Sequence, residues 1–293
     1  MRHAYLIIAH HEFEILKLLV NALDDHRNDI YIHFDKKVES LPQLEVSNAN
    51  LIILKDRLDV RWGHVSQIEV ELLLFGSAYN IANANYNYYH LISGVDIPIK
   101  SQNYIHDFFT KHHGKEFIGF TQGNTSKEID RKVRRYHLFS KDFRGGDSIG
   151  QRCKRIIRAG VLRFQEILGI KRNIDIEFKK GTNWVSVTHG FVHYLLSQES
   201  HIQRLYDRTF CADEIFLQTV CWNSPYKNHI YDLLDSRNSS KRMIKWQDNM
   251  IHDWQIDDVD FLISSPGLFA RKFSSQNISI VHQIINKLKL SKV

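Results

Sequence analysis

The sequence predicts an α/β protein built on an open sheet flanked by helices. Residues 4–9, Ala-Tyr-Leu-Ile-Ile-Ala, form a continuous apolar run, which is typical of a strand buried on both faces of a parallel sheet. A helical pattern follows over residues 13–23, and two more short apolar runs come after it. This order, a strand, a helix and two strands, is how open α/β sheets begin.

Each further element is predicted from its own pattern. Apolar residues recurring every three or four positions predict helices at 66–78, 103–110, 191–197, 201–208, 215–221, 259–264 and 278–290. Short apolar or alternating runs bounded by turn residues predict strands at 30–34, 51–54, 88–93, 116–120, 181–187 and 243–246. Turn-forming and polar residues predict loops at 94–100 and 235–242.

Two of the predicted strands end in polar side chains. His10 and His11 follow the first strand, and Asp35 follows the second. Open α/β sheets bind ligands at the carboxyl ends of their strands. These side chains are therefore candidates for a binding site.

Composition describes an ordinary globular protein of 293 residues, with 43% hydrophobic and 25% charged residues. The net charge of +6 favours an anionic ligand or surface, such as a nucleotide, a phosphate, a nucleic acid or a membrane. No recognisable module interleaves the basic residues with aromatic ones, so we expect no nucleic-acid partner. Three cysteines without metal or redox spacing, no signal peptide and no apolar run of about 20 residues predict a soluble protein of a reducing compartment.

Basic residues concentrate in the stretch 127–180. Its apolar content is too low for a core of its own, so we expect an insertion and not a separate domain. Two interpretations stay open for its charge: a solvated basic face, or a surface that contacts an anion or a membrane.

Two adjacent acids, Asp213 and Glu214, stand at the start of the predicted helix 215–221. Asp213 reads as a helix N-cap and Glu214 as a first-turn acid favoured by the helix dipole. Alternatively, the helix presents a carboxylate to a cleft. Spacing alone favours the first interpretation, because acids are enriched in first helical turns.

Seven segments taken together resemble the core-2/I-branching β-1,6-N-acetylglucosaminyltransferase family, which also includes the protein xylosyltransferases. No single segment is specific, but the set occurs in the family's order, at 4–11, 32–37, 88–100, 181–187, 213–214, 242–246 and 268–273. The resemblance implies a GT-A fold, a Rossmann-like mixed sheet flanked by helices in one domain, 1–293. Its parts would be a nucleotide-binding half (1–120), the basic insertion (127–180) and an acceptor-binding and catalytic half (181–293).

The resemblance also implies an inverting transfer from a UDP-sugar, with GlcNAc or xylose as the sugar, to a hydroxyl of a glycan or glycolipid. Glu214 matches the family's catalytic base, which would take the proton of the acceptor hydroxyl. The N-terminal half has no metal-holding Asp-x-Asp motif, and Asp258-Val259-Asp260 comes too late in the chain. We therefore expect no metal and no other cofactor, with basic side chains neutralising the diphosphate instead.

Further site residues follow from the same resemblance. Lys272 matches a phosphate-binding lysine, and Arg242 is our substitute for the family's phosphate-binding arginine. The uridine side corresponds to His10, Asp35 and Arg61. The remaining substrate-side positions are Asp96, Trp184, Asp213 and Trp246.

The sequence lacks the family's set of secretory-pathway cysteines and its membrane anchor. We therefore expect a bacterial, cytoplasmic member at the inner face of the membrane, with a lipid-linked oligosaccharide or surface-polysaccharide intermediate as acceptor. The basic insertion would then face the anionic membrane as a peripheral contact. The alternative is a non-catalytic protein that binds sugar nucleotides or glycans, against which Glu214 and Lys272 together speak.

Overall fold

The computed structural model describes residues 1–81, 85–144, 146–248 and 250–290. Its centre is a five-stranded sheet of order β3-β2-β1-β4-β6. Four strands run parallel: β1 (His3–Ala9), β2 (Asn28–Phe34), β3 (Asn50–Ile53) and β4 (Tyr88–Ser93). The fifth, β6 (Ser186–Thr188), pairs antiparallel with β4. The carboxyl ends of the four parallel strands therefore meet at one edge of the sheet.

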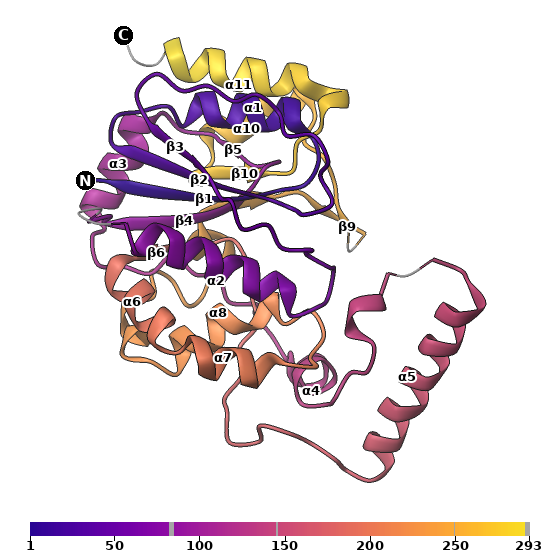
Figure 1. The fold of residues 1–293 in the computed structure, drawn as a ribbon. Coiled ribbons are helices and arrows are strands. Elements are labelled where there is room, and N and C mark those ends of the chain that lie inside the picture. The colour runs from indigo at the N-terminus through magenta and orange to yellow at the C-terminus, as the bar shows by residue number, and fades with distance from the viewer. Residues whose placement is uncertain (82–84, 145, 249, 291–293) are drawn as a thin grey trace.

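Helices cover both faces of this sheet (Figure 1). One face packs on α1 (Phe13–Ala22), α3 (Gln102–Lys111), α10 (Val259–Ser264) and α11 (Ile278–Leu290). The other packs on α2 (Ser66–Tyr79), α6 (His189–Ser197), α7 (Glu199–Tyr206) and α8 (Asp213–Trp222). Successive side chains of a strand point to opposite faces. Leu6 of β1 thus enters one core while Tyr5 and Ile7 enter the other, which is why the strand is apolar throughout.

Residues far apart in the chain also share a second sheet. It has the order β5-β10-β7 and consists of β5 (Ile97–Pro98), β7 (Arg242–Ile244) and β10 (Phe269–Arg271). A small hairpin, β8 (Trp246–Gln247) and β9 (Met250–Ile251), follows β7. Because β5 and β6 each pair across the two predicted halves, 1–120 and 181–293, the halves form one packed unit.

The basic stretch 127–180 leaves this body as an arm. It begins in α4 (Ser126–Val133) and carries α5 (Ile149–Ile167), which is set apart from the sheet and its helices (Figure 1). From these two helices only Ile129 and Val133, both of α4, join the main hydrophobic core. The two ends of the arm therefore join the core of the body, through α4 and Phe178, whereas α5 adds no residue to it.

The predicted Rossmann-like mixed sheet flanked by helices is confirmed. Five local predictions are wrong. The predicted loop 94–100 contains β5, and the predicted strand 243–246 is interrupted at Lys245, between β7 and β8. Residues 116–120 make only isolated bridges, because Glu116 pairs with Ile230 and Phe117 with Ser186 of β6, so neighbouring residues do not follow one partner strand. Strand 181–187 is ordered as β6 only from Ser186. The predicted loop 235–242 contains α9 (Ser236–Ser240), which Asp235 caps by accepting bonds from the backbone N–H groups of Arg237 and Asn238.

Buried histidines should make the fold sensitive to acid. His3 lies against His106, with ring centroids 4.0 Å apart, and 3.1 Å separate its Nδ1 from Nε2 of His90. Burial, followed by the charges of neighbouring groups, lowers the pKa of His3 and of His90 well below the ordinary value and that of His106 to about 4. Burial also lowers the pKa of His33 and of His137 to about 4.

We predict a loss of stability as the pH falls below the ordinary histidine pKa of about 6.5, because the unfolded chain then binds protons that the folded histidines refuse. Three acids oppose this: burial raises the pKa of Glu116 to about 7, that of Asp213 to about 6 and that of Glu71 well above its usual value. The five buried histidines outnumber these three acids. Lowering the pH by one unit below about 6.5 should therefore lower the free energy of unfolding by about 2 kcal/mol. Urea unfolding at a series of pH values measures this, and equal midpoints on both sides of the histidine range would contradict it.

Candidate active site

The strand order places a crevice at the carboxyl edge of the sheet. The chain adds β2 and β3 on one side of β1 and then returns to place β4 on the other side, and ligands bind at such a switch point. His10 follows β1 there. The backbone N–H of Phe273 donates to the Val95 carbonyl oxygen after β4, at 3.1 Å, which brings the end of β10 to this edge.

Arg271 and Lys272 lie close to the histidines that follow β1. Partial burial and the charges of Lys272 and Arg271 lower the pKa of His11, against the opposing charge of Glu12. Two cations from the C-terminal part of the chain thus stand beside the first strand end. An anionic ligand in the crevice would meet them.

The predicted uridine-side residues gather at the ends of β1 and β2. His10 and Asp35 line a cavity of about 390 Å³ together with Lys37. Asp35 is buried, and its carboxylate accepts bonds from Lys37 Nζ at 2.8 Å and from the Val60 backbone N–H at 3.2 Å. Lys37 also pairs with Asp59, which pairs with Arg61 at 2.7 Å. Asp35 therefore orders the loop that carries Arg61.

A second cavity, of about 330 Å³, collects residues from the second half of the chain. Its lining includes Glu214 and the two predicted tryptophans, Trp184 and Trp246. Trp246 is exposed on the β8–β9 hairpin, whereas Trp184 is half-buried. A carboxylate and two indole faces around one hollow suit a sugar, whose C–H faces pack on aromatic rings and whose hydroxyls reach polar groups.

Glu214 is held by two lysines. Its Oε2 lies 2.9 Å from Lys132 Nζ of α4 and 3.5 Å from Lys180 Nζ. Lys132 is buried, and burial lowers its pKa, but the charges of Glu214 and Glu128 raise the pKa above the ordinary value. Glu128 bridges the same two lysines at 2.8 and 3.1 Å. Both lysines thus approach Glu214 at Oε2.

A glycine permits this arrangement. The Gly181 backbone N–H donates to the Glu214 carbonyl oxygen at 2.8 Å. A Cβ at this position would stand 1.8 Å from the Gly119 carbonyl oxygen, which no side chain could tolerate. The close approach of three backbone segments is therefore what brings Lys180 beside Glu214.

Asp213 is neither the N-cap of α8 nor a wall of the cavity. Ala212 occupies the N-cap position, and no side chain caps the helix there. Asp213 is buried and its Oδ2 accepts bonds from Gln67 at 2.9 Å and Asn183 at 2.6 Å. Burial and the charge of Glu214 raise the pKa of Asp213 to about 6. Its contacts fix the start of α8 against α2, so we correct its role from substrate binding to positioning Glu214.

Arg242 also differs from its predicted role. It borders the second cavity, but the residue is only 2% exposed, and its guanidinium donates to the carbonyl oxygens of Ser240 and Val185, both at 2.8 Å. Nη1 and Nη2 are thus committed to the protein, and the buried Nε is the one nitrogen of this guanidinium without a partner among the described residues, which argues against a phosphate contact.

Arg271 keeps more donor nitrogens without a hydrogen bond than Arg242 does, among the residues that the structure describes. Its guanidinium lies over the Trp184 ring at 4.2 Å, and its Nε is 3.7 Å from Asp96 Oδ1. Nε and Nη1 are buried, yet neither has a hydrogen-bond acceptor among the residues that the structure describes. Lys272 is 43% exposed beside Asp253. Arg271 and Lys272, adjacent in sequence, are the better pair for a diphosphate.

Asp96 is likewise corrected. It is 1% exposed and accepts bonds from the Ser93 backbone N–H at 3.0 Å and the Ser93 hydroxyl at 2.8 Å. A sugar cannot reach a carboxylate buried in this way. Asp96 shapes the loop after β4 and supplies the negative charge beneath Arg271.

Four residues of the candidate site were not predicted from the sequence: Glu128, Lys132, Lys180 and Arg271. The helical spacing of Glu128 and Lys132 was a visible signal for an ion pair. Nothing in the sequence indicated that Lys132 reaches Glu214, because that contact joins residues 82 positions apart.

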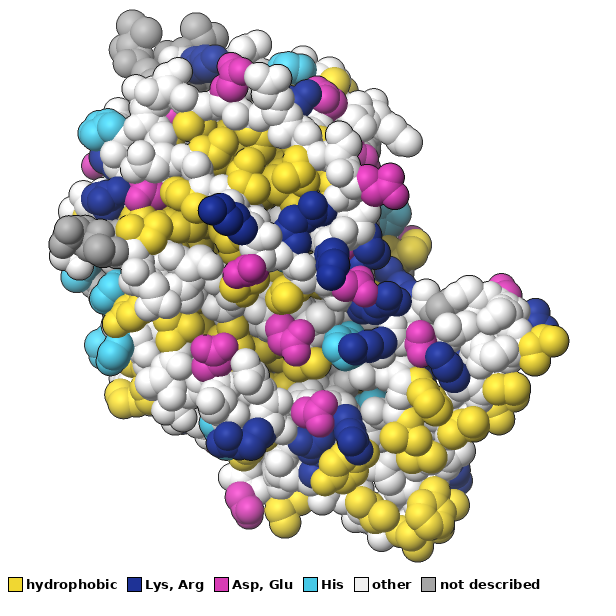
Figure 2. Space-filling view, viewed as in Figure 1, with side chains coloured by type: hydrophobic (Ala, Val, Ile, Leu, Met, Phe, Trp, Pro, Cys, Tyr) yellow, Lys and Arg dark blue, Asp and Glu magenta, His cyan; other side chains and the backbone are white. Residues whose placement is uncertain are grey.

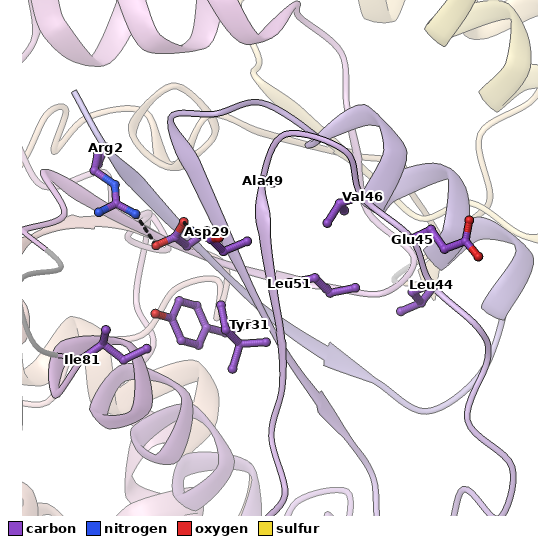
Figure 3. Close-up of a pocket in the computed structure, with 11 residues that line it drawn as sticks. Arg2, Asp29, Tyr31, Leu44, Glu45, Val46, Ala49, Leu51 and Ile81 are labelled. Atoms are coloured by element: carbon purple, nitrogen blue, oxygen red, sulfur yellow. Dashed lines mark hydrogen bonds and ion pairs between the residues drawn. The ribbon is translucent and has the colours of Figure 1, made fainter.

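A further cavity, of about 800 Å³, lies at the opposite edge of the sheet (Figure 3). It is lined by residues at the amino ends of strands, among them Asp29 of β2, which pairs with Arg2 at 2.6 Å. None of the predicted site residues lines it. We therefore place the candidate site at the carboxyl edge.

The chain is similar over most of its length to proteins of one enzyme family. The profile of the Core-2/I-Branching enzyme family matches residues 3–269. Xylosyltransferase 2 of Canis lupus familiaris is 25% identical over 94% of this chain, which corresponds to 32% of that protein. A human β-1,3-galactosyl-O-glycosyl-glycoprotein β-1,6-N-acetylglucosaminyltransferase is 24% identical over 83% of this chain and 55% of that protein.

The chain thus spans about a third of the length of the xylosyltransferases that it matches. A solved structure of apo mouse xyloside xylosyltransferase 1 covers 94% of this chain and 99% of its own, but with 10% identity and a TM-score of 0.36 it adds nothing to the assignment. The family profile spans both the strand ends and the Glu214 cavity, and on this ground the chain belongs to the Core-2/I-branching enzyme family.

Proposed function

We propose that the protein is an inverting glycosyltransferase that moves a sugar, GlcNAc or xylose, from a UDP-sugar to a hydroxyl of a glycan or a lipid-linked oligosaccharide. The observation that supports this best is the second cavity. The carboxylate of Glu214, which pairs with two lysines, lines it together with the rings of Trp184 and Trp246. The guanidinium of Arg271, whose Nε and Nη1 have no hydrogen-bond acceptor among the described residues, lies over the Trp184 ring. Family membership supports the same reaction class.

In the proposed reaction the acceptor oxygen attacks the anomeric carbon from the face opposite UDP. A new C–O bond forms as the bond to the UDP oxygen breaks, and Glu214 takes the proton of the acceptor hydroxyl. The pairing of Oε2 with Lys132 and Lys180 orients the carboxylate for the acceptor. Trp184 and Trp246 would hold sugar rings at their C–H faces.

The leaving diphosphate gathers negative charge as the bond breaks. Arg271 and Lys272 stand where such charge would be stabilised, with His10, Asp35 and Arg61 on the uridine side of the crevice. Preformed cations need no reorganisation at the moment of reaction, which makes them effective in the transition state. UDP release from UDP-GlcNAc and UDP-xylose by the purified protein, with and without saccharide acceptors, tests the function. Tight UDP binding without any transfer would favour the non-catalytic alternative.

We predict that UDP binds without a divalent cation. Arg271 and Lys272 supply the positive charge that a metal would otherwise provide, and no Asp-x-Asp motif follows an N-terminal strand. Titration calorimetry with UDP in EDTA and in magnesium or manganese should give dissociation constants within about threefold, or about 0.6 kcal/mol. Loss of binding in EDTA would overturn the prediction.

A further inference from the structure

Helix α5 packs on the preceding part of the arm, residues 136–143, with its more polar side. The less exposed positions recur at helical spacing and lie on one face of the helix: Gln151, Lys154, Arg158, Val161, Leu162 and Gln165. Gln165 is buried and exchanges hydrogen bonds with the Tyr136 backbone, at 2.8 and 3.0 Å. Arg158 stacks on Phe143 at 4.3 Å, and Lys154 pairs with Asp142 at 2.7 Å. Polar and charged groups therefore attach this helix.

The opposite face of α5 is apolar and turned to solvent. Ile149 is 82% exposed, Ile156 71% and Ile167 70%, and Ile157 and Phe164 share their side of the helix. Surface helices normally bury such a stripe against the core. Here nothing in the described residues covers it, and Figure 2 shows hydrophobic side chains gathered over the arm. A contiguous exposed apolar face of this kind marks an interaction site.

Positive charge accompanies the apolar face. Helix α5 carries five basic residues and one acidic residue, Glu166. Arg152, Arg155 and Arg163 are exposed alongside the apolar face. The pattern continues past the helix, where Ile174 is 62% exposed near Lys171 and Arg172. An apolar stripe bordered by arginines has the chemistry of a helix that lies in the surface of an anionic bilayer.

We propose that α5 and the turn after it form a docking surface for an anionic lipid bilayer. The helix would lie in the membrane plane, with its isoleucines among the acyl chains and its arginines extended to the lipid phosphates. In the described part of the chain, no helix is long and apolar enough to cross a membrane, so the contact is peripheral. A second copy of this chain fits less well, because a symmetric pairing of the two apolar faces would bring like-charged arginines together.

Flotation of the full-length protein with lipid vesicles tests the proposal. Binding should occur with phosphatidylcholine vesicles that contain phosphatidylglycerol, and it should weaken with salt and on pure phosphatidylcholine. The double variant I156Q/F164Q should bind at least about tenfold more weakly, because it removes two membrane-facing apolar side chains. R152Q/R163Q should lose affinity for the anionic vesicles specifically. The matched control is Leu234→Gln, because Leu234 lies outside the arm and is 86% exposed. This variant should bind vesicles as the wild type does.

Two outcomes would overturn the proposal. One is vesicle binding that none of the α5 variants changes. The other is no vesicle binding together with self-association in sedimentation analysis that I156Q/F164Q abolishes, which would assign the face to a second copy. Melting curves show whether the variants are folded. Neither readout depends on sugar transfer, so failure here leaves the proposed reaction untouched.

Discussion

Replacement of Glu214 by Gln is expected to reduce sugar transfer by about 10²-fold or more while UDP affinity and melting temperature stay close to those of the wild type. The amide keeps the shape of the side chain and an oxygen that Lys132 and Lys180 can approach. It cannot accept the proton of the acceptor hydroxyl, and a general base contributes about 10²–10⁴-fold. A UDP-release assay at saturating donor and acceptor measures the effect on turnover.

The control for this variant is Asp213→Asn at the neighbouring position. Its side-chain oxygen can still accept the bonds from Gln67 and Asn183, and the residue does not line the cavity. Most of the activity should therefore survive. A Glu214→Gln enzyme with more than about half of wild-type turnover would remove Glu214 from the role of base, since the loss of a base worth about 10²-fold could not go unnoticed.

Replacement of Lys272 or Arg271 by Ala should weaken UDP binding by about 10- to 100-fold, and uridine binding far less. A charge-assisted hydrogen bond is worth about 1.5–3 kcal/mol, and these cations address the diphosphate rather than the nucleoside. Arg271→Ala should have the larger effect, because its buried donors Nε and Nη1 have no other acceptor in the described residues. Calorimetry with UDP and with uridine separates the two contributions.

Lys17 provides the matched control for Lys272. It has nearly the same exposure, 42% against 43%, and also lies beside an acid, Glu14, but it is on α1 and outside both candidate cavities. Lys17→Ala should leave UDP affinity unchanged. Equal losses for UDP and uridine in Lys272→Ala would move Lys272 out of the phosphate site.

The sequence predicted the sheet well because its strands are buried on both faces. The run 4–9 is apolar at every position, and only a central strand with a core on each side requires that. The short strands near the site were harder. Residues 181–185 stay irregular since Gly181 must approach Gly119, a constraint set by a segment about 60 residues away.

The same limit applies to the functional side chains. Glu214 could be proposed as the base because it lies in a segment, 213–214, that resembles the family. Its contacts with two lysines could not be predicted. Arg242 and Arg271 look alike in sequence, and only the fold shows that both terminal nitrogens of Arg242 donate to the protein, whereas Nε and Nη1 of Arg271 have no acceptor among the described residues. Burial and hydrogen bonding, which depend on contacts distant in the chain, decide which of two arginines can meet a ligand.

The attachment of the arm has a consequence for how such proteins can diversify. The outward face of α5 shares no core contact with the sheet, so substitutions there should change the stability of the body little and independently of changes at the site. Substitutions on this one helix face could therefore change which charged surface the protein binds, while the rest of the protein stays the same. The proposed membrane-binding face and the proposed catalytic carboxylate would lie in separate stretches of the chain, and Lys132 and Lys180 of the arm contact that carboxylate.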